Sequence, residues 1–100
     1  MNVTEFLNTQ ITSIISIIES LSDFFDSHKF IQVFTQEYQS EYLEMLNEYA
    51  SSEQPFQSVH QQIARFLSEN QATLRIQKQG KTKSNNIFGV STLNENWRKV

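Results

Sequence analysis

The chain has 100 residues and a mass of 11.7 kDa, which is the size of one small domain. Its hydrophobic content of 38% excludes a disordered chain, and the absence of cysteine excludes a disulfide framework, a thiolate metal site and cysteine catalysis. No apolar run approaches the roughly 20 residues that cross a bilayer, and Met1 to Phe6 lacks the positive charge that opens a secretory signal. The sequence therefore predicts a cytoplasmic protein without a membrane segment.

The first 25 residues carry the most regular apolar pattern of the chain. A spacing that alternates between four and three residues is typical of one face of a helix. We therefore expect a helix over about residues 3–24, with Asn2 or Thr4 as its N-cap. The residues that form this pattern are Val3, Leu7, Ile11, Ile14, Ile18, Leu21 and Phe25.

A second helix is predicted over residues 27–50, after the capping pair Asp26-Ser27. Two long helices joined by a short turn favour an antiparallel helical hairpin. The apolar residues of the second helix again recur every three or four positions: Ile31, Phe34, Tyr38, Tyr42, Met45 and Tyr49.

A third, shorter helix is predicted over residues 55–69, because Pro55 is tolerated in a first helical turn. Residues 1–70 thus form a helical domain. The alternation over residues 73–78 and the turn-like Gln79-Gly80-Lys81 indicate that residues 71–100 form a short β-hairpin, or else an irregular arm docked through Ile87, Phe88 and Trp97.

The predicted fold class is mainly α: the helical hairpin and the third helix form either a three-helix bundle or, in a homodimer, a four-helix bundle. The dimer is favoured because the apolar stripe of the first helix is wider than one neighbour needs. Three helices followed by a hairpin is also the order of a winged-helix domain. We discount that order, because a second helix of about 24 residues is too long for a compact helix-turn-helix.

Charge divides the chain into two opposed parts. Residues 1–70 hold ten acidic and two basic residues, a net charge of −8, whereas residues 71–100 hold six basic and one acidic residue, a net charge of +5. Three interpretations compete for an acidic ridge on the second helix: a solvated face, a face covered by the basic arm, or a surface for a basic partner. The acidic ridge comprises Glu37, Glu41, Glu44 and Glu48, which are spaced four, three and four residues apart.

The basic arm has a binding interpretation of its own. Lys78, Lys81 and Lys83 could follow phosphates while Phe88 or Trp97 stacks on a base, although a pI of about 5.3 is unusual for a nucleic-acid binder. The segment from Ser84 to Gly89, followed by Trp97, resembles a motif and is interpreted first as a seal on the end of the bundle.

Catalytic signals are weak. Asp26, His28 and His60 are the only residues that suggest an acid–base or metal site, and their spacing matches no known motif. We therefore predict a protein that is not an enzyme and has no cofactor or metal. Its predicted function is protein–protein interaction through the acidic ridge and the basic arm, with an unknown protein partner. The alternatives are a small nucleic-acid-binding regulator that uses the arm, and a phage or mobile-element inhibitor that uses the ridge.

Overall fold

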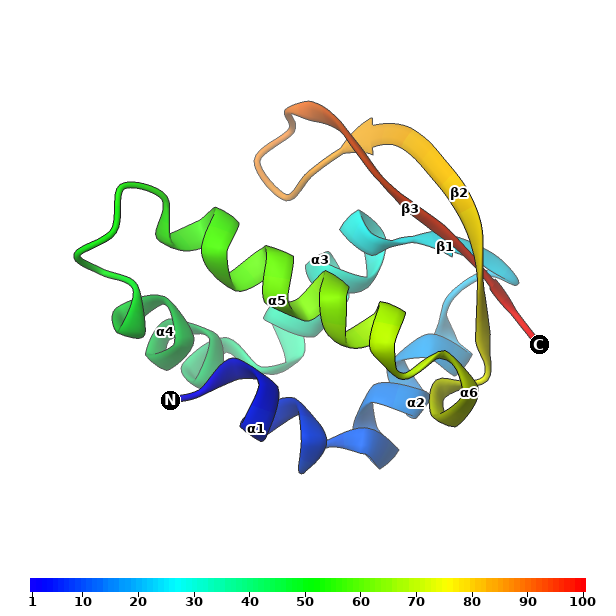
Figure 1. The fold of residues 1–100 in the computed structure, drawn as a ribbon, viewed down its shortest axis with the longest axis horizontal. Helices are drawn as coiled ribbons and strands as arrows, with labels where there is room; N and C mark the ends of the chain where they lie inside the picture. Colours follow the sequence, from blue (N-terminus) through cyan, green and yellow to red (C-terminus); the bar gives the residue numbers. More distant parts are fainter.

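The computed structural model describes residues 1–100, which form six helices and a three-stranded antiparallel sheet of order β1-β3-β2 (Figure 1). The prediction of a mainly α bundle is therefore wrong, and the fold is mixed α+β. None of the helices is both long enough and apolar enough to span a membrane. In chain order the elements are α1 (Val3–Asn8), α2 (Ile11–Ser20), β1 (Phe24–Asp26), α3 (Ser27–Glu37), α4 (Gln39–Glu48), α5 (Pro55–Glu69), α6 (Gln71–Leu74), β2 (Ile76–Asn85) and β3 (Ser91–Lys99).

The predicted first helix is divided into three elements. It begins as expected, with the Asn2 side chain accepting from the amide of Glu5. It breaks after Thr9, whose hydroxyl donates to the carbonyl of Phe6, and the backbone leaves the helical region at Gln10 (φ −117°, ψ 23°). After α2 the chain is extended, and β1 pairs with β3 so that Phe25 lies opposite Trp97. The antiparallel pairing explains why this segment is not helical.

The predicted second helix is divided at Tyr38, whose backbone angles of φ −115° and ψ 49° are not helical. The ring of Tyr38 packs edge-on against Phe6, with centroids 5.5 Å apart, and its hydroxyl donates to Oε1 of Gln10 at 3.0 Å. These contacts with α1 and the start of α2 accompany the bend between α3 and α4. The predicted helix of about 24 residues, which was the objection to the winged-helix order, is therefore two shorter helices. The order still differs from that of a winged helix, because α4 is an additional element between α3 and α5.

Helix α5 spans the range that the sequence predicts, with Pro55 in its first turn. It is followed by the short α6, which ends at Arg75 in the left-handed conformation (φ 56°). This residue turns the chain into β2, and the β2–β3 hairpin then arches over α3 and α5, with α1 and α2 on the opposite side of α5 (Figure 1).

The register of the hairpin contains one irregularity. Lys78 lies opposite Trp97, but Gly80 lies opposite Asn96, so β2 has one extra residue at this point, a β-bulge. Beyond it, Lys81 pairs with Glu95 and Lys83 with Leu93. Because paired residues share a side of a sheet and Leu93, Glu95 and Trp97 alternate along β3, the bulge brings all three lysines to one side of the ladder.

One hydrophobic core unites the helices with residues 71–100. Leu74, Ile76 and Trp97 are buried in the same cluster as the apolar residues of α1 to α5. The indole nitrogen of Trp97 donates to the hydroxyl of Ser27 at the start of α3, at 2.9 Å. Because the apolar stripe of α1 and α2 is buried within a single chain, it no longer argues for a dimer, and the homodimer stays a prediction.

Candidate functional site

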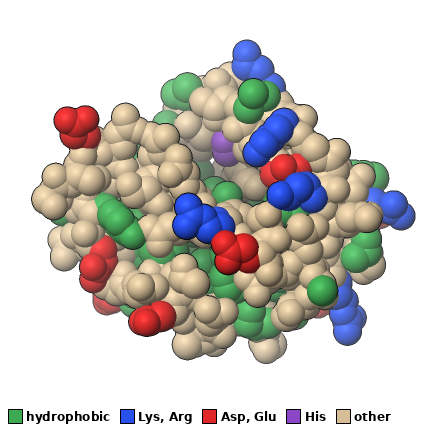
Figure 2. All heavy atoms as spheres, in the orientation of Figure 1, with side chains coloured by type: hydrophobic (Ala, Val, Ile, Leu, Met, Phe, Trp, Pro, Cys, Tyr) green, Lys and Arg blue, Asp and Glu red, His purple; other side chains and the backbone are tan.

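A groove of about 970 Å³ runs between α5 and the β2–β3 hairpin, with the first residues of α3 at its base. The helix contributes its polar face, including Gln57, Gln61 and Arg65, and the hairpin contributes Lys78 and Lys81. Figure 2 shows this hollow with a histidine visible inside it and charged side chains around its rim. It is much larger than the second cavity of the molecule, which measures about 160 Å³ between α1 and α5.

The tip of the hairpin closes one end of the groove. Its turn is fixed by Oδ1 of Asn86, which accepts from the amides of Phe88 (2.9 Å) and Val90 (3.1 Å). Gly89 follows with a φ of 78°, a conformation that favours glycine. This turn presents Phe88 to the first turn of α5, where its ring meets Phe56 edge-on at 5.0 Å between centroids. The motif-like segment around Phe88 therefore docks the tip onto α5.

His60 lies at this aromatic end, with its ring nearly parallel to those of Tyr42 and Phe88. Its Nε2 lies 2.6 Å from the hydroxyl oxygen of Tyr42. Burial, with a smaller electrostatic contribution from His28, lowers the pKa of His60 to about 4, and burial raises the pKa of Tyr42 to about 12. Both groups are uncharged at neutral pH, so His60 and Tyr42 add no charge to the aromatic end of the groove.

Cations occupy the other end. Lys78 Nζ donates to the hydroxyl of Ser68 at 2.8 Å and lies 5.9 Å from the centroid of the Trp97 ring. Lys81 is two-thirds exposed, and its Nζ is 3.8 Å from the carboxylate of Glu95. Arg65 is exposed on the facing helix wall. Cations thus line both walls of the groove.

The structure does not form a metal site from Asp26, His28 and His60, the weak candidates of the sequence. Both ring nitrogens of His28 are engaged with the hairpin, Nδ1 with the hydroxyl of Ser84 at 2.9 Å and Nε2 with that of Thr92 at 3.2 Å. Asp26 is the N-cap of α3, where its carboxylate accepts from an amide. The structure has no cluster of three His, Asp or Glu side chains placed to hold an ion. His28 and Asp26 therefore act locally as structural groups.

The acidic ridge lies apart from the groove. Glu37 ends α3, whereas Glu41, Glu44 and Glu48 lie on α4, at the end of the molecule away from the sheet (Figure 1). The only ion pairs in the structure are Lys81–Glu95 and that of the Met1 amino group with Glu48. The interpretation that the basic arm covers the ridge is therefore wrong. Interaction of the ridge with a basic partner stays a prediction.

The structure unites one part of the predicted partner surface. Lys78, Lys81, Phe88 and Trp97 all line the groove, and Lys83 follows the same side of the hairpin outside its lining. Sequence reasoning missed Phe56, Arg65 and Glu95. The sequence does place Arg65 on the polar face of an amphipathic helix. That position by itself indicates only that the side chain is exposed to solvent.

Comparison of the chain with protein-family models, with curated proteins and with solved structures finds no match.

Proposed function

We propose that the protein is a nucleic-acid-binding module that holds a single strand in the groove between α5 and the β2–β3 hairpin. The observation that carries this proposal is the pairing of cations on both walls with exposed aromatic rings at one end of the same concavity. Proteins that bind single strands combine a basic groove along the backbone with aromatic side chains on which bases stack.

The cations supply the phosphate contacts. Arg65 on α5 faces the hairpin wall that carries Lys78 and Lys81, so a strand lying in the groove meets positive charge from both sides. The lysines are held in line by the β-bulge, which places them on one side of the ladder. Two carboxylates, of Glu53 and Glu95, also line the groove. Glu95 is partly neutralised by Lys81.

The aromatic rings supply the base contacts. Phe88 is 56% exposed and Phe56 is 41% exposed, and both line the groove. An exposed ring in the same groove as a basic surface is a platform for a base, and such stacking contributes about 1–3 kcal/mol per base. The concave shape favours a single strand, because a duplex is read by convex elements that enter its grooves.

The acidic α4 and the net charge of −3 oppose binding elsewhere on the surface. Binding to nucleic acid is therefore expected to be local to the groove and sensitive to salt. A nucleic-acid-binding role is compatible with the cytoplasmic location that the sequence predicts, and that location stays a prediction. A binding role, rather than catalysis, requires no cofactor.

The test is fluorescence anisotropy with labelled single-stranded RNA and DNA and a matched duplex, at several salt concentrations. We expect single strands to bind more tightly than the duplex. With three phosphate contacts, the slope of log K against log salt should be about −2, and each cation removed should reduce it by about 0.7.

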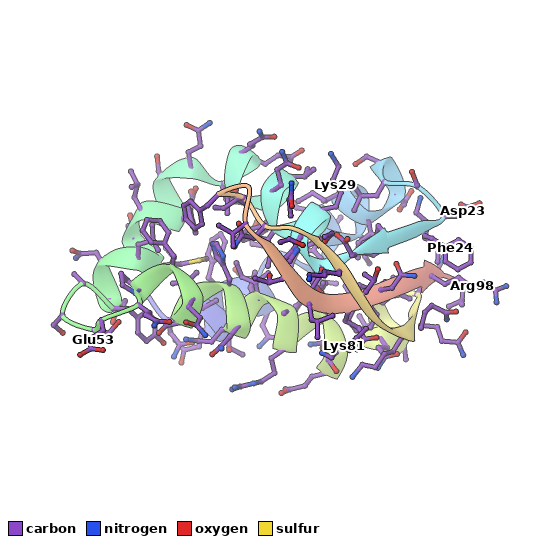
Figure 3. The ribbon with its side chains drawn as sticks, turned by 90° about the horizontal axis from the view of Figure 1, so that it is seen from above. Asp23, Phe24, Lys29, Glu53, Lys81 and Arg98 are labelled. Atoms are coloured by element: carbon purple, nitrogen blue, oxygen red, sulfur yellow. The ribbon has the colours of Figure 1, made fainter.

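The variants Arg65→Ala and Lys81→Ala should each weaken binding several-fold. The matched control is Lys29→Ala, because Lys29 is an exposed lysine on α3 that does not line the groove and lies across the hairpin from Lys81 (Figure 3). Unchanged melting temperatures would show that the variants remain folded. Absence of binding at low salt, or an equal effect of Lys29→Ala, would refute the proposal, and preferential capture of an acidic peptide would favour a protein partner instead.

A further inference from the structure

Glu95 is the only carboxylate that is both buried and part of the groove wall. It is 9% exposed, in contrast to Glu53, which is exposed at the rim beside α5 (Figure 3). Burial of a charged side chain is unfavourable unless its hydrogen-bonding capacity is used. The question is therefore which donors use the two oxygens of Glu95.

One oxygen is hydrogen-bonded within the hairpin. Oε2 accepts from the amide of Gly80 at 2.6 Å. Gly80 has a φ of 113° and follows the extra residue of the β-bulge. Only glycine adopts this backbone conformation readily, and the conformation points the Gly80 amide at the carboxylate. The bulge therefore fixes the orientation of the Glu95 carboxylate.

The other oxygen keeps open acceptor positions. Oε1 lies 3.8 Å from Nζ of Lys81, which is too long for a hydrogen bond, and no other donor contacts it. A carboxylate oxygen has about two acceptor positions of its own. Oε1 thus offers an oriented and negatively charged acceptor in the wall of the groove, on a side chain that is mostly buried but with this oxygen still open to solvent.

We propose that Oε1 of Glu95 accepts a hydrogen bond from the exocyclic amino group of a base, and so selects adenine, cytosine or guanine over uracil and thymine. This inference rests on the proposed binding of a single strand. Exposed base edges of single strands are recognised by hydrogen bonding, and acidic side chains accept from the amino group of cytosine. Uracil has a carbonyl oxygen where cytosine has its amino group. That oxygen and the carboxylate are both acceptors, so no hydrogen bond can form between them.

The expected size of the base selection is that of one well-placed contact to a base edge. A well-placed contact to a base edge discriminates by about 1–3 kcal/mol, which corresponds to a ratio of about tenfold to one hundredfold. Cytosine and uracil give the matched comparison, because both are single pyrimidine rings with similar stacking surfaces. We expect an oligocytidine to bind at least about tenfold more tightly than an oligouridine of the same length and at the same salt.

The variant Glu95→Gln distinguishes base selection from simple charge. The carbonyl of the glutamine can still accept from Gly80, which turns the amide NH₂ toward the groove as a donor. The preference should then disappear or reverse in favour of oligouridine. The control Glu53→Gln makes the same charge change at the exposed rim and should strengthen both oligomers equally.

A second measurement needs no variant. Oligocytidine whose amino groups are dimethylated lacks the donors, and wild-type protein should bind it about as weakly as oligouridine. Equal affinity of the wild type for oligocytidine and oligouridine would overturn the inference while leaving strand binding intact. An equal gain for both oligomers in Glu95→Gln would also overturn it, whereas failure of every oligomer to bind would refute the proposed function itself.

Discussion

Replacement of Trp97 by phenylalanine tests the connection between the sheet and the helices. Trp97 is 1% exposed in β3, and its Nε1 donates to the hydroxyl of Ser27, which is itself buried at the start of α3. Phenylalanine retains an aromatic ring in the core but removes the N–H and part of the indole. The change therefore leaves the Ser27 hydroxyl buried without this partner.

The magnitude follows from these two losses. An unpaired buried hydroxyl is unfavourable by about 1–3 kcal/mol, and the smaller ring leaves a cavity whose contribution is about 1 kcal/mol. We expect Trp97→Phe to lower the free energy of unfolding by about 2–4 kcal/mol, a large fraction of the roughly 5–15 kcal/mol that a small domain has. Ser27→Ala, which strands the indole N–H instead, should lower it by about 1–3 kcal/mol.

The double variant isolates the hydrogen bond. When both partners are removed neither is left unpaired, so the loss in the double variant should be smaller than the sum of the single losses by about 1 kcal/mol or more. Urea unfolding followed by far-ultraviolet circular dichroism suits all four proteins, because Trp97 is the only tryptophan and the two variants that replace it have no tryptophan fluorescence. Losses that add within about 0.5 kcal/mol would refute the reasoning.

Three further predictions concern stability. The folded-state pKa of His60, about 4, lies below the usual histidine value of 6.5. The stability that its neutral form contributes is therefore complete above about pH 6.5 and is lost as the pH falls toward 4, and His60→Gln should flatten the fall in melting temperature over that range. Lys99 Nζ donates to two carbonyls at the end of α2, so Lys99→Ala should lower the free energy of unfolding by about 1–2 kcal/mol in urea titration, whereas Arg98→Ala, beside it but exposed, should have little effect. Gly89→Ala introduces a side chain at a φ of 78° and should destabilise by about 1 kcal/mol, and an unchanged urea midpoint would contradict this role.

Local signals were sufficient where an element is defined by its own residues. Helix α5 has Pro55 in its first turn and an apolar stripe that ends with the helix, and α3 begins at the capping residue Asp26. The helix breaks were not visible in this way. The apolar spacing continues through Thr9 without a glycine or proline, and the deviation at Tyr38 accompanies packing against Phe6, which lies in another helix.

The sheet and the site depend on contacts between distant segments. Three residues of β1 become a strand because β3 pairs with them. The strand propensity of two phenylalanines is too weak and context-dependent a signal to separate a strand from a helix end. The lysines of the groove were named from the sequence, but the opposite wall was not. Arg65 and Phe56 acquire their place from the way the hairpin folds over α5, and Glu95 became a candidate only through its burial.

The pairing of β1 with β3 also determines when the molecule can finish folding during its synthesis. Trp97 and Ser27 are 70 positions apart, so the ribosome has made nearly the whole described chain before either has its partner. Until β3 has left the exit tunnel, Phe25 has no opposing strand and the apolar faces of α2 and α3 lack part of their cover. Completion of the fold therefore waits for β3, and until then the nascent helices keep apolar surface exposed that can aggregate.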